Sequence, residues 1–576
     1  MPAPTAQLPA ARAPVGQAVG VADPPPEDIQ ARLGPRRLPP QRLWERLGSG
    51  RFYVALGAVA LAVAALSLLL PSTPSYDPWS WLIWGREILH LDLHTTGGPS
   101  WKPLPVMFTT VLAVFGGGQP DLWLVVARAG AFMAVAMVFR LAYRITRQLT
   151  EAAGSTQPTA PRIGSVLPAV LAGLIAAVSL INSTSFITDN ALGYSEGLAA
   201  ALMLVAVDRC MDGALRQAFV VGFFAALDRP ELWFFWAPYG AYLWWRDPGS
   251  RRLVLGLFVL VPALWFLPEL WGSGHLFRAL TRAQRPRAGT AALSQCPVCT
   301  EFQKTAWQSV LNRVKVAGIL GLLVAAWGLW ATRGSWWRHP NVDGRTRARA
   351  WLLAIGSFGL LWWLGIAIET EAGLSGSIRY LMLGTACVAI AGGVAWGWLA
   401  GAVAAGLRRF TSSLSAPGWP ALAPAAGTVL SLALFLAVPP WIGRTMISLP
   451  ATHRTLLYQA HLRDDLVAAV RGSGGAAALS RCGTAMTETY QVPMVAWTLG
   501  QPIDRVQSPP GQITEGRWPN VILQARAHAS SPLLPSPAQV RAWAEQGAQF
   551  TPLTRARTFT VLAACRRHPA SGVGGP

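Results

Sequence analysis

Long apolar runs recur between residues 52 and 442, and short polar segments rich in arginine separate them. A helix that crosses roughly 30 Å of hydrocarbon needs about 20 mostly apolar residues. The pattern therefore predicts about eleven membrane spans and a polytopic α-helical membrane protein. We expect the spans near 52–70, 121–143, 165–182, 190–207, 215–228, 231–245, 253–268, 314–331, 351–368, 380–404 and 425–442.

The arginines predict how these spans are oriented, because positive charge gathers in the cytoplasmic loops of membrane proteins. The strongest inside signal is the arginine-rich segment 332–350. With that loop inside, the N-terminus lies inside and the C-terminus outside. The transmembrane domain is then 51–442, with enlarged outer loops at 71–120 and 269–312. Residues 1–50, rich in proline and arginine, are predicted to be a disordered cytoplasmic tail.

The apolar run 103–115 stops at Gly-Gly-Gly-Gln-Pro and is too short to span comfortably. If it did span, Arg140 and Arg144 would lie outside, against the positive-inside pattern. We therefore expect a re-entrant or surface helix here, within the enlarged first outer loop.

Residues 443–568 differ from the rest, since they are polar and contain only short alternating runs. We expect a small extracytoplasmic α/β domain, followed by a tail at 569–576. DDLVAAVRG and PAQVRAWAEQG are predicted to be helices, whereas AAALSRC, VPMVAWTL, NVILQAR and TFTVLAAC are predicted to be strands.

Composition agrees with a membrane protein and argues against a nucleic-acid partner. The chain is 52% hydrophobic and 13% charged, whereas a soluble domain carries about 25% charged residues. The net charge of +21 comes from arginines that lie between apolar runs, where membrane topology accounts for them. The abundance of Ala, Gly, Pro and Arg suggests a bacterial genome. We therefore expect an integral protein of a bacterial cytoplasmic membrane, with membrane lipids as partners.

Charge is concentrated in the first predicted outer loop, from Tyr76 to Pro105, where several acidic, basic and histidine residues lie among tryptophans. A chain that is otherwise poor in charge needs a reason for this density. We take Asp77 as the leading candidate for a catalytic carboxylate, which would deprotonate an acceptor hydroxyl.

Other ionisable residues lie at the predicted outer ends of later spans. Such groups are costly near a membrane and are therefore functional candidates. Arginines there would clamp phosphate, bidentately where the geometry permits. The candidates for binding the phosphate of a donor are Lys102, Arg128, Arg229 and Arg379, and those for a second acid are Asp189, Glu196 and Glu231.

Four motifs carry a resemblance to a known family. They are Asp77-Pro-Trp-Ser-Trp, Lys102-Pro-Leu-Pro, the stretch from Phe115-Gly116 through Trp123 to Arg128, and GFFAALDRPELW with Arg229 in place of a lysine. Over about 52–245 the chain resembles the GT-C superfamily of polyprenyl-phosphate-dependent glycosyltransferases. The closest pattern is that of the bacterial ArnT-like and protein-mannosyltransferase-like branch, glycosyltransferase family 39.

This resemblance implies a membrane enzyme with many spans, an enlarged first outer loop and a C-terminal outer domain. It implies transfer of a sugar from a polyprenyl-phosphate donor to a cell-envelope glycan or protein acceptor at the outer membrane face. The family usually has paired acids after its first span, and here only Asp77 remains, followed by proline. The second acid must then come from another part of the chain.

Structural explanations of the same residues stay open. Asp77 could initiate a turn and cap a helix, and Lys102 could snorkel to the interface. Arg128 and Arg379 could belong to structural ion pairs, and Asp-Arg-Pro-Glu at 228–231 could form a loop salt bridge. The alternatives to an active enzyme are a catalytically inactive GT-C-fold envelope assembly protein and a transporter or flippase for a lipid-linked intermediate.

The cysteines and histidines suggest disulfides more than a metal. Cys296 and Cys299 lie in one predicted outer loop. We expect them to form a disulfide or to remain free thiols, rather than to provide half of a zinc site. Cys482 and Cys565 lie in the predicted outer domain and are candidates to pair. His90 and His94 could share one helix face but lack a third ligand. No metal site or cofactor is established, and a divalent metal is the one cofactor left open.

Overall fold

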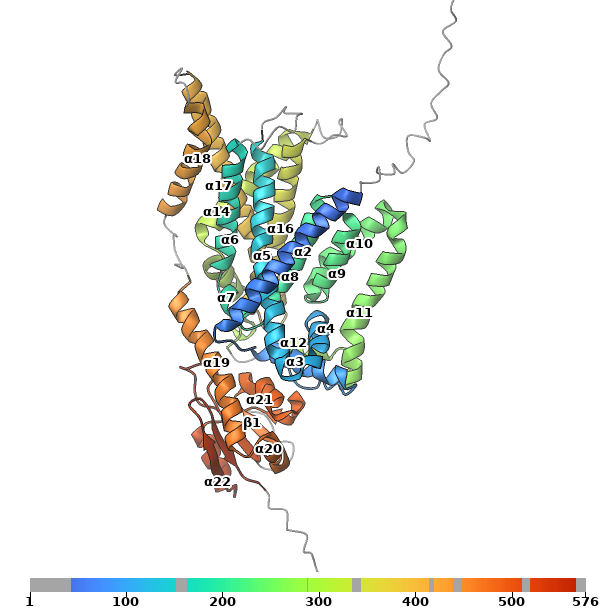
Figure 1. Ribbon diagram of the computed structural model, residues 1–576, viewed down its shortest axis with the longest axis vertical. Coiled ribbons are helices and arrows are strands. Elements are labelled where there is room, and N and C mark those ends of the chain that lie inside the picture. Colours follow the sequence, from blue (N-terminus) through green and yellow to red (C-terminus); the bar gives the residue numbers. More distant parts are fainter. Residues whose placement is uncertain are drawn as a thin grey trace, which may run out of the picture. The chain divides into compact units, whose positions relative to one another are not determined.

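The computed structural model describes residues 43–151, 163–286, 289–333, 343–413, 419–438, 447–509 and 518–565. Figure 1 shows a group of long helices, followed in the chain by a part that contains a five-stranded sheet. The chain divides into two compact units, Met1–Ala55 and Leu56–Pro576, and all contacts given below lie within the second. Of the predicted tails, 1–50 lies mostly and 569–576 wholly outside the described residues.

Helices dominate the chain up to residue 437. The predicted spans correspond to α2 (Leu43–Leu66), α5 (Gln119–Thr150), α6 (Ile163–Ile181), α8 (Glu196–Met211), α9 (Leu215–Ala226), α10 (Trp233–Arg246), α11 (Arg251–Ser273), α14 (Asn312–Ala331), α16 (Gly344–Glu371), α17 (Met382–Ser413) and α18 (Trp419–Ala437). Shorter helices connect them: α3 (Tyr76–Leu89), α4 (Pro103–Leu112), α7 (Phe186–Ala191), α12 (Arg278–Ala283) and α13 (Pro297–Gln303).

The protein is a polytopic helical membrane protein. Among the described residues, 6 helices are long and apolar enough to cross a membrane, and α6, α9 and α18 contain shorter apolar stretches. The count of eleven spans is not confirmed. The run 103–115 forms the 10-residue helix α4 and the start of the 3-10 segment η2 (Ala113–Gly118). Segment η2 separates α4 from α5. Gly116 has a φ of 53° there, which a residue with a Cβ rarely adopts.

Four of the long helices run in the same direction. A Cβ added at Gly130 of α5 would lie 2.6 Å from Leu198 of α8, and Arg140 bonds Asp208 ten residues further along both helices. Close contacts likewise pair Gly318 with Gly392 and Gly321 with Ala395 between α14 and α17. Thr146 and Thr150 of α5 meet Gly397 and Gly401 of α17 in order. The N-terminal ends of α5, α8, α14 and α17 therefore point to one membrane face.

Helix α3 lies in the interior of the segment 71–120. Trp79, Trp81 and Trp84 are at most 2% exposed, so these tryptophans pack inside the protein. Gly85 explains how α4 fits against α3, because an added Cβ there would lie 2.5 Å from the backbone of Thr109. This segment is thus a packed layer that fixes where Asp77 lies.

The C-terminal part contains α19 (Leu449–Gly472), α20 (Ala476–Cys482), α21 (Val492–Leu499), α22 (Pro537–Glu545) and a mixed sheet of order β2-β1-β3-β5-β4. The strands are β1 (Ala485–Thr487), β2 (Val506–Gln507), β3 (Val521–Gln524), β4 (Thr551–Arg555) and β5 (Thr560–Ala563). Strand β1 is parallel to β2 and β3, whereas β5 is antiparallel to β3 and β4.

Two of the six element predictions in this part are wrong. AAALSRC and VPMVAWTL, expected to be strands, form the helices α20 and α21. Both runs have only 7 or 8 residues, and periodicity alone does not separate strand from helix at that length. The other two strands and both helices are confirmed as β3, β5, α22 and a section of α19.

Candidate active site

Asp77 lies in the first turn of α3, directly before Pro78. The side chain is 8% exposed and is bonded by Arg379, whose Nη2 donates to Asp77 Oδ2 over 2.6 Å. Proline is favourable in a first helical turn because its missing N–H has no intrahelical partner there. The local sequence therefore starts a helix at the point where the carboxylate meets the arginine.

Arg379 lies 302 positions after Asp77 in the chain. It lies in η7 (Ile378–Leu381), the short turn between α16 and α17. Its guanidinium lies 4.1 Å from the ring of Tyr194 and 5.2 Å from that of Tyr380, so two aromatic faces fix its plane. Its Nε also lies 3.8 Å from Glu196 Oε1. One guanidinium thus joins two of the candidate acids.

Glu196 is the centre of the cluster. It is the first residue of α8, and its side chain is fully buried. Three cations approach its Oε1 atom, at 3.4 Å from Lys102, 3.7 Å from Arg229 and 3.8 Å from Arg379. We call Asp77, Lys102, Glu196, Arg229 and Arg379 the Glu196 cluster.

Lys102 and Arg229 reach Glu196 from two further turns. Lys102 is the N-cap residue of α4, and its Nζ donates to Ser195 Oγ over 3.2 Å. Arg229 precedes Pro230 in the turn between α9 and α10, and its guanidinium lies 4.3 Å from the ring of Tyr380. Glu231 in the same turn lies 3.6 Å from Arg229. The cluster therefore draws on five separate elements.

Two more acids border the cluster. Asp228 is fully buried, and burial raises its pKa to about 6, an effect that the charge of Lys102 opposes. Asp189 lies in α7, between the spans, and burial raises its pKa to about 7 against the opposing influence of Ser185 and Arg379. A carboxyl group with such a pKa can hold or release a proton near neutral pH.

Several charged atoms of the cluster have no hydrogen-bond partner within the part of the chain that the structure describes. They are Oε2 of Glu196, Nη1 of Arg379, and Nε and Nη2 of Arg229. Unpaired buried donors are costly, so an anionic group that accepted from both arginines would be favourable. The helices α4 and α8 also begin here, and helix N-termini favour anions. The arrangement fits a phosphate group.

Arg128 is not brought to this cluster. Its guanidinium donates to Ser67 and Ser72 and to the carbonyl of Ala191, with its Nε, Nη1 and Nη2 all in use. It ties the end of the first span to the end of α7 through hydrogen bonds, which is a structural role different from the ion pair left open for it. We therefore leave Arg128 out of the candidate site.

The two histidines of the first loop bond the backbone. Nδ1 of His90 lies 2.8 Å from the carbonyl of Arg86, and Nδ1 of His94 lies 3.0 Å from that of Asp92. Within the described ranges, no group of three His, Cys, Asp or Glu side chains that could hold a metal ion is found.

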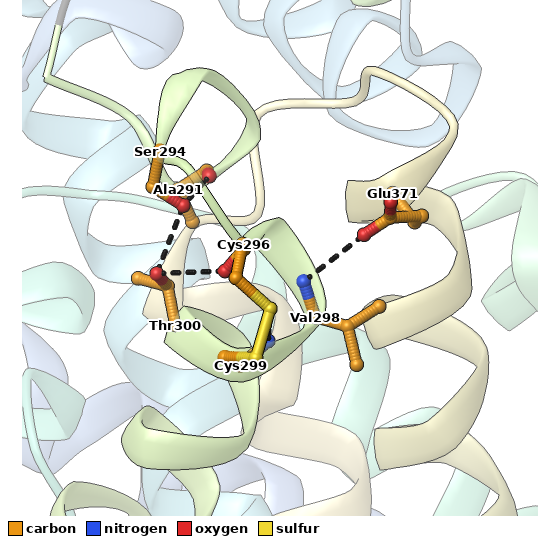
Figure 2. The surroundings of a disulfide bond; sticks show 7 residues. All are labelled: Ala291, Ser294, Cys296, Val298, Cys299, Thr300 and Glu371. Carbon is orange, nitrogen blue, oxygen red and sulfur yellow. Dashed lines mark hydrogen bonds between the residues drawn. A yellow bond between two sulfur atoms is a disulfide. The ribbon is translucent and has the colours of Figure 1, made fainter.

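A disulfide supports the loop that carries Arg379. Figure 2 shows Cys296 joined to Cys299 at the start of α13, where the N–H of Val298 donates to Glu371 Oε2 over 3.2 Å. Further along, Lys304 donates to the carbonyl of Gly376, three residues before Arg379. This segment therefore holds both ends of the turn between α16 and η7. Cys482 and Cys565 form the second disulfide.

Three residues of the site were not among the sequence candidates: Tyr194, Ser195 and Tyr380. Two of them directly precede or follow a candidate in sequence, which was the only signal available for them, whereas Asp228 belongs to the Asp-Arg-Pro-Glu turn noted above. Their role depends on stacking and on a hydrogen bond between elements far apart in the chain, and no local pattern predicts such contacts.

The fold is similar to solved structures of ArnT from Cupriavidus metallidurans, one bound to undecaprenyl phosphate and one in the apo state. Identity is 12% and 13%, the matches cover 91% and 90% of this chain and 99% and 98% of theirs, and the TM-scores are 0.45 and 0.44. An Archaeoglobus fulgidus oligosaccharyltransferase, in complex with Zn and sulfate, matches at 12% identity over 79% of this chain and 62% of its own, with a TM-score of 0.35.

No protein-family model matches the chain, and no curated protein matches it in sequence. The resemblance to ArnT-like proteins that the first-loop motifs indicated is confirmed as a resemblance. Because these TM-scores lie below 0.5, we base the function on the residues of this chain.

Proposed function

We propose that this protein is a membrane glycosyltransferase that transfers a sugar from a polyprenyl-phosphate donor to a cell-envelope acceptor. The observation that carries the proposal is the Glu196 cluster. Three cations meet where α4 and α8 begin, and the two arginines among them have buried donors with no partner in the described residues. Lys102, Arg229 and Arg379 would hold the phosphate, and Glu196 keeps them in place when the phosphate has left.

Asp77 is the proposed base. Its carboxylate accepts a hydrogen bond from Arg379 at 2.6 Å. A phosphate that competes for this arginine would free the carboxylate at the moment when the donor is bound. Asp77 then takes the proton of the acceptor hydroxyl. The hydroxyl oxygen bonds the anomeric carbon of the sugar, and the bond from that carbon to the phosphate oxygen breaks.

An apolar cavity that extends from Leu232, next to the turn with Arg229, toward Cys210 would hold the lipid part of the donor. It has a volume of about 210 Å³ and lies among α8, α9, α10 and α16. Leu232, which lines it, directly follows Glu231, the partner of Arg229. A chain that leaves the phosphate at Arg229 could enter this cavity without crossing the cluster. We place the site at the outer face of a bacterial cytoplasmic membrane, as the arginine pattern predicts.

A second candidate function is favoured by the same bond between Asp77 and Arg379. A short ion pair between buried partners is also what a protein would keep if it had retained the fold and lost the chemistry. In that case the protein would act in envelope assembly without transferring a sugar.

The test is complementation of a strain that lacks the gene. Asp77→Asn removes the base but keeps the size of the side chain, so we expect transfer to fall at least 100-fold and lipid-linked sugars to accumulate. The matched control is Asp121→Asn, because Asp121 also pairs with an arginine, Arg463 at 2.8 Å, outside the cluster. Envelope glycans and lipid-linked sugars are measured by mass spectrometry at equal amounts of inserted protein.

The outcomes separate the two candidates. Loss in the Asp77 variant with full activity in the Asp121 variant supports the enzyme. If the Asp77 variant restores the wild-type envelope, the carboxylate is not catalytic and the assembly function is favoured.

A further inference from the structure

A second apolar groove is larger than the cavity among α8, α9, α10 and α16. It has a volume of about 590 Å³ and is lined by residues of α14 and α17, including Arg313, and by Val438. Apart from Arg313, its lining side chains are aliphatic or aromatic, such as Val316, Leu320 and Leu399. The volume lies in the range of about 300–1,000 Å³ that is typical of ligand sites.

Arg313 is a half-buried cation without a carboxylate partner among the described residues. Its Nη1 donates to the carbonyl of Phe435 over 2.8 Å, and the guanidinium lies 4.5 Å from the ring of Phe435. Its Nε is buried and donates to no acceptor in the described ranges, where no Asp or Glu forms an ion pair with it. The chain between α18 and α19, Pro-Pro-Trp-Ile-Gly-Arg-Thr-Met at 439–446, contains no acid either. Among the described residues, no acid therefore compensates this positive charge.

The depth of the groove matches one leaflet. The lining residues of α14 run from Arg313 to Val324, which is about 16 Å at 1.5 Å per residue. Half of the hydrocarbon thickness is roughly 15 Å. Since Arg313 is the second residue of the 20-residue helix α14, it lies at the membrane–water interface, where lipid phosphates are found.

The groove opens toward a defined membrane face. Helices α14 and α17 run in the same direction, as the contacts of Gly318 with Gly392 and of Gly321 with Ala395 require. Arg379 precedes α17, so Arg313 and the Glu196 cluster are on the same side of the bilayer. The groove therefore serves lipids of the leaflet that the candidate site faces.

We propose that this groove binds an anionic phospholipid, with one acyl chain along α14 and α17 and the negative headgroup at Arg313. A free phosphate would leave the apolar groove unfilled, and a neutral lipid would leave the arginine uncompensated. Only a lipid with net negative charge satisfies both parts. This inference is independent of the proposed transferase activity.

The test uses the purified full-length protein in detergent and native mass spectrometry. The probes are phosphatidylglycerol and phosphatidylcholine with identical acyl chains. We expect the wild type to retain phosphatidylglycerol at least about fivefold better, because one charge near a membrane surface contributes about that factor. Arg313→Gln should lower the retention of phosphatidylglycerol to that of phosphatidylcholine. Arg313→Lys should keep most of the difference between the two lipids.

A second variant tests the groove itself. Ala317 lines the groove. Ile319 is an exposed residue of the same helix and does not line the groove. Ala317→Trp should fill the space and reduce retention of both lipids at least fivefold, and the matched control Ile319→Trp should not. Arg285→Gln, in an exposed loop, controls for loss of any arginine. Unchanged preference in Arg313→Gln, or equal retention by the two tryptophan variants, would overturn the proposal.

Discussion

Two groups of charged residues lie at the two ends of α8, and they are built differently. The second group, which we call the Asp208 cluster, comprises Arg140, Arg144, Asp208, Arg209 and Asp212. All five lie in or directly after α5 and α8. Arg140 and Arg144 both bond the fully buried Asp208, and Arg144 and Arg209 bond Asp212 at 2.6 and 2.8 Å.

The Glu196 cluster has a looser geometry. Its separations from Glu196 are 3.4 to 3.8 Å, its residues come from five elements, and four of its charged atoms have no hydrogen-bond partner among the described residues. Only the bond between Asp77 and Arg379, at 2.6 Å, is as short as those of the Asp208 cluster. Short bonds between two helices fix those helices relative to each other, whereas longer separations among many elements leave room for another anion. The contrast favours a structural role for the Asp208 cluster and agrees with the proposal that the Glu196 cluster binds a ligand.

The largest effect should come from breaking the Asp208 cluster. Asp208→Asn leaves Arg140 and Arg144 with a neutral partner, and removing one member of a buried ion pair costs about 3–5 kcal/mol of unfolding free energy. Thermal unfolding in detergent measures the loss. Sugar transfer per folded molecule should stay within about twofold of wild type. Normal stability, or lost transfer in the folded fraction, would contradict the structural role.

A charge-preserving change should affect the two clusters in opposite ways. Arg379→Lys keeps the charge but loses the planar fork that can bond Asp77 and a phosphate together. We expect transfer to fall about 10- to 100-fold, the value of one hydrogen bond to a charged group, with nearly normal thermal stability. The matched variant Arg144→Lys should lower stability and leave transfer per folded molecule unchanged. Normal transfer by Arg379→Lys would show that the phosphate does not require a planar guanidinium at this position.

Most of the fold and part of the site were predictable from the sequence. Each predicted span contains a helix because an apolar run is a local property. In contrast, Asp77 and Arg379 are 302 positions apart, and no local pattern pairs them. Ser195 and Tyr194 gain their roles only when α8 begins beside Lys102 and Arg379. Helix α21 was missed even though Pro493 in its first turn is a helix-start signal.

The pH dependence of stability offers a smaller contrast. The pKa of Asp189 is raised from 3.8 to about 7 by burial. The folded protein therefore binds more protons than the unfolded chain between about pH 4 and pH 7, and its stability falls as the pH rises through this range. Asp189→Asn should remove that decline. Melting temperatures of the wild type and of Asp189→Asn at pH 5 and pH 8 measure this decline. An equal change in melting temperature with pH in the two proteins would contradict the raised pKa.

The smallest expected effect concerns the support of Arg379. Lys304 donates to the carbonyl of Gly376 and lies 3.0 Å from Glu301. Lys304→Met removes both contacts and frees the loop before Arg379, so we expect transfer to fall about 3- to 10-fold, the value of one or two ordinary hydrogen bonds. Lys304→Arg should restore most of it. If both variants transfer equally, the loop does not depend on this lysine.

The packing of α21 on α3 has a consequence for how the protein is made. Trp497 of α21 lies 5.8 Å from Trp79, and Arg86 of α3 lies 4.8 Å from the ring of Trp497. The helix that carries Asp77 is synthesised early, but the surface against which it packs leaves the ribosome more than 400 residues later. A nascent chain, or one truncated before residue 492, would contain every cation of the cluster. It would lack the surface of α21 that holds α3, and with it Asp77, in place. Translation beyond residue 499 then becomes a condition for activity.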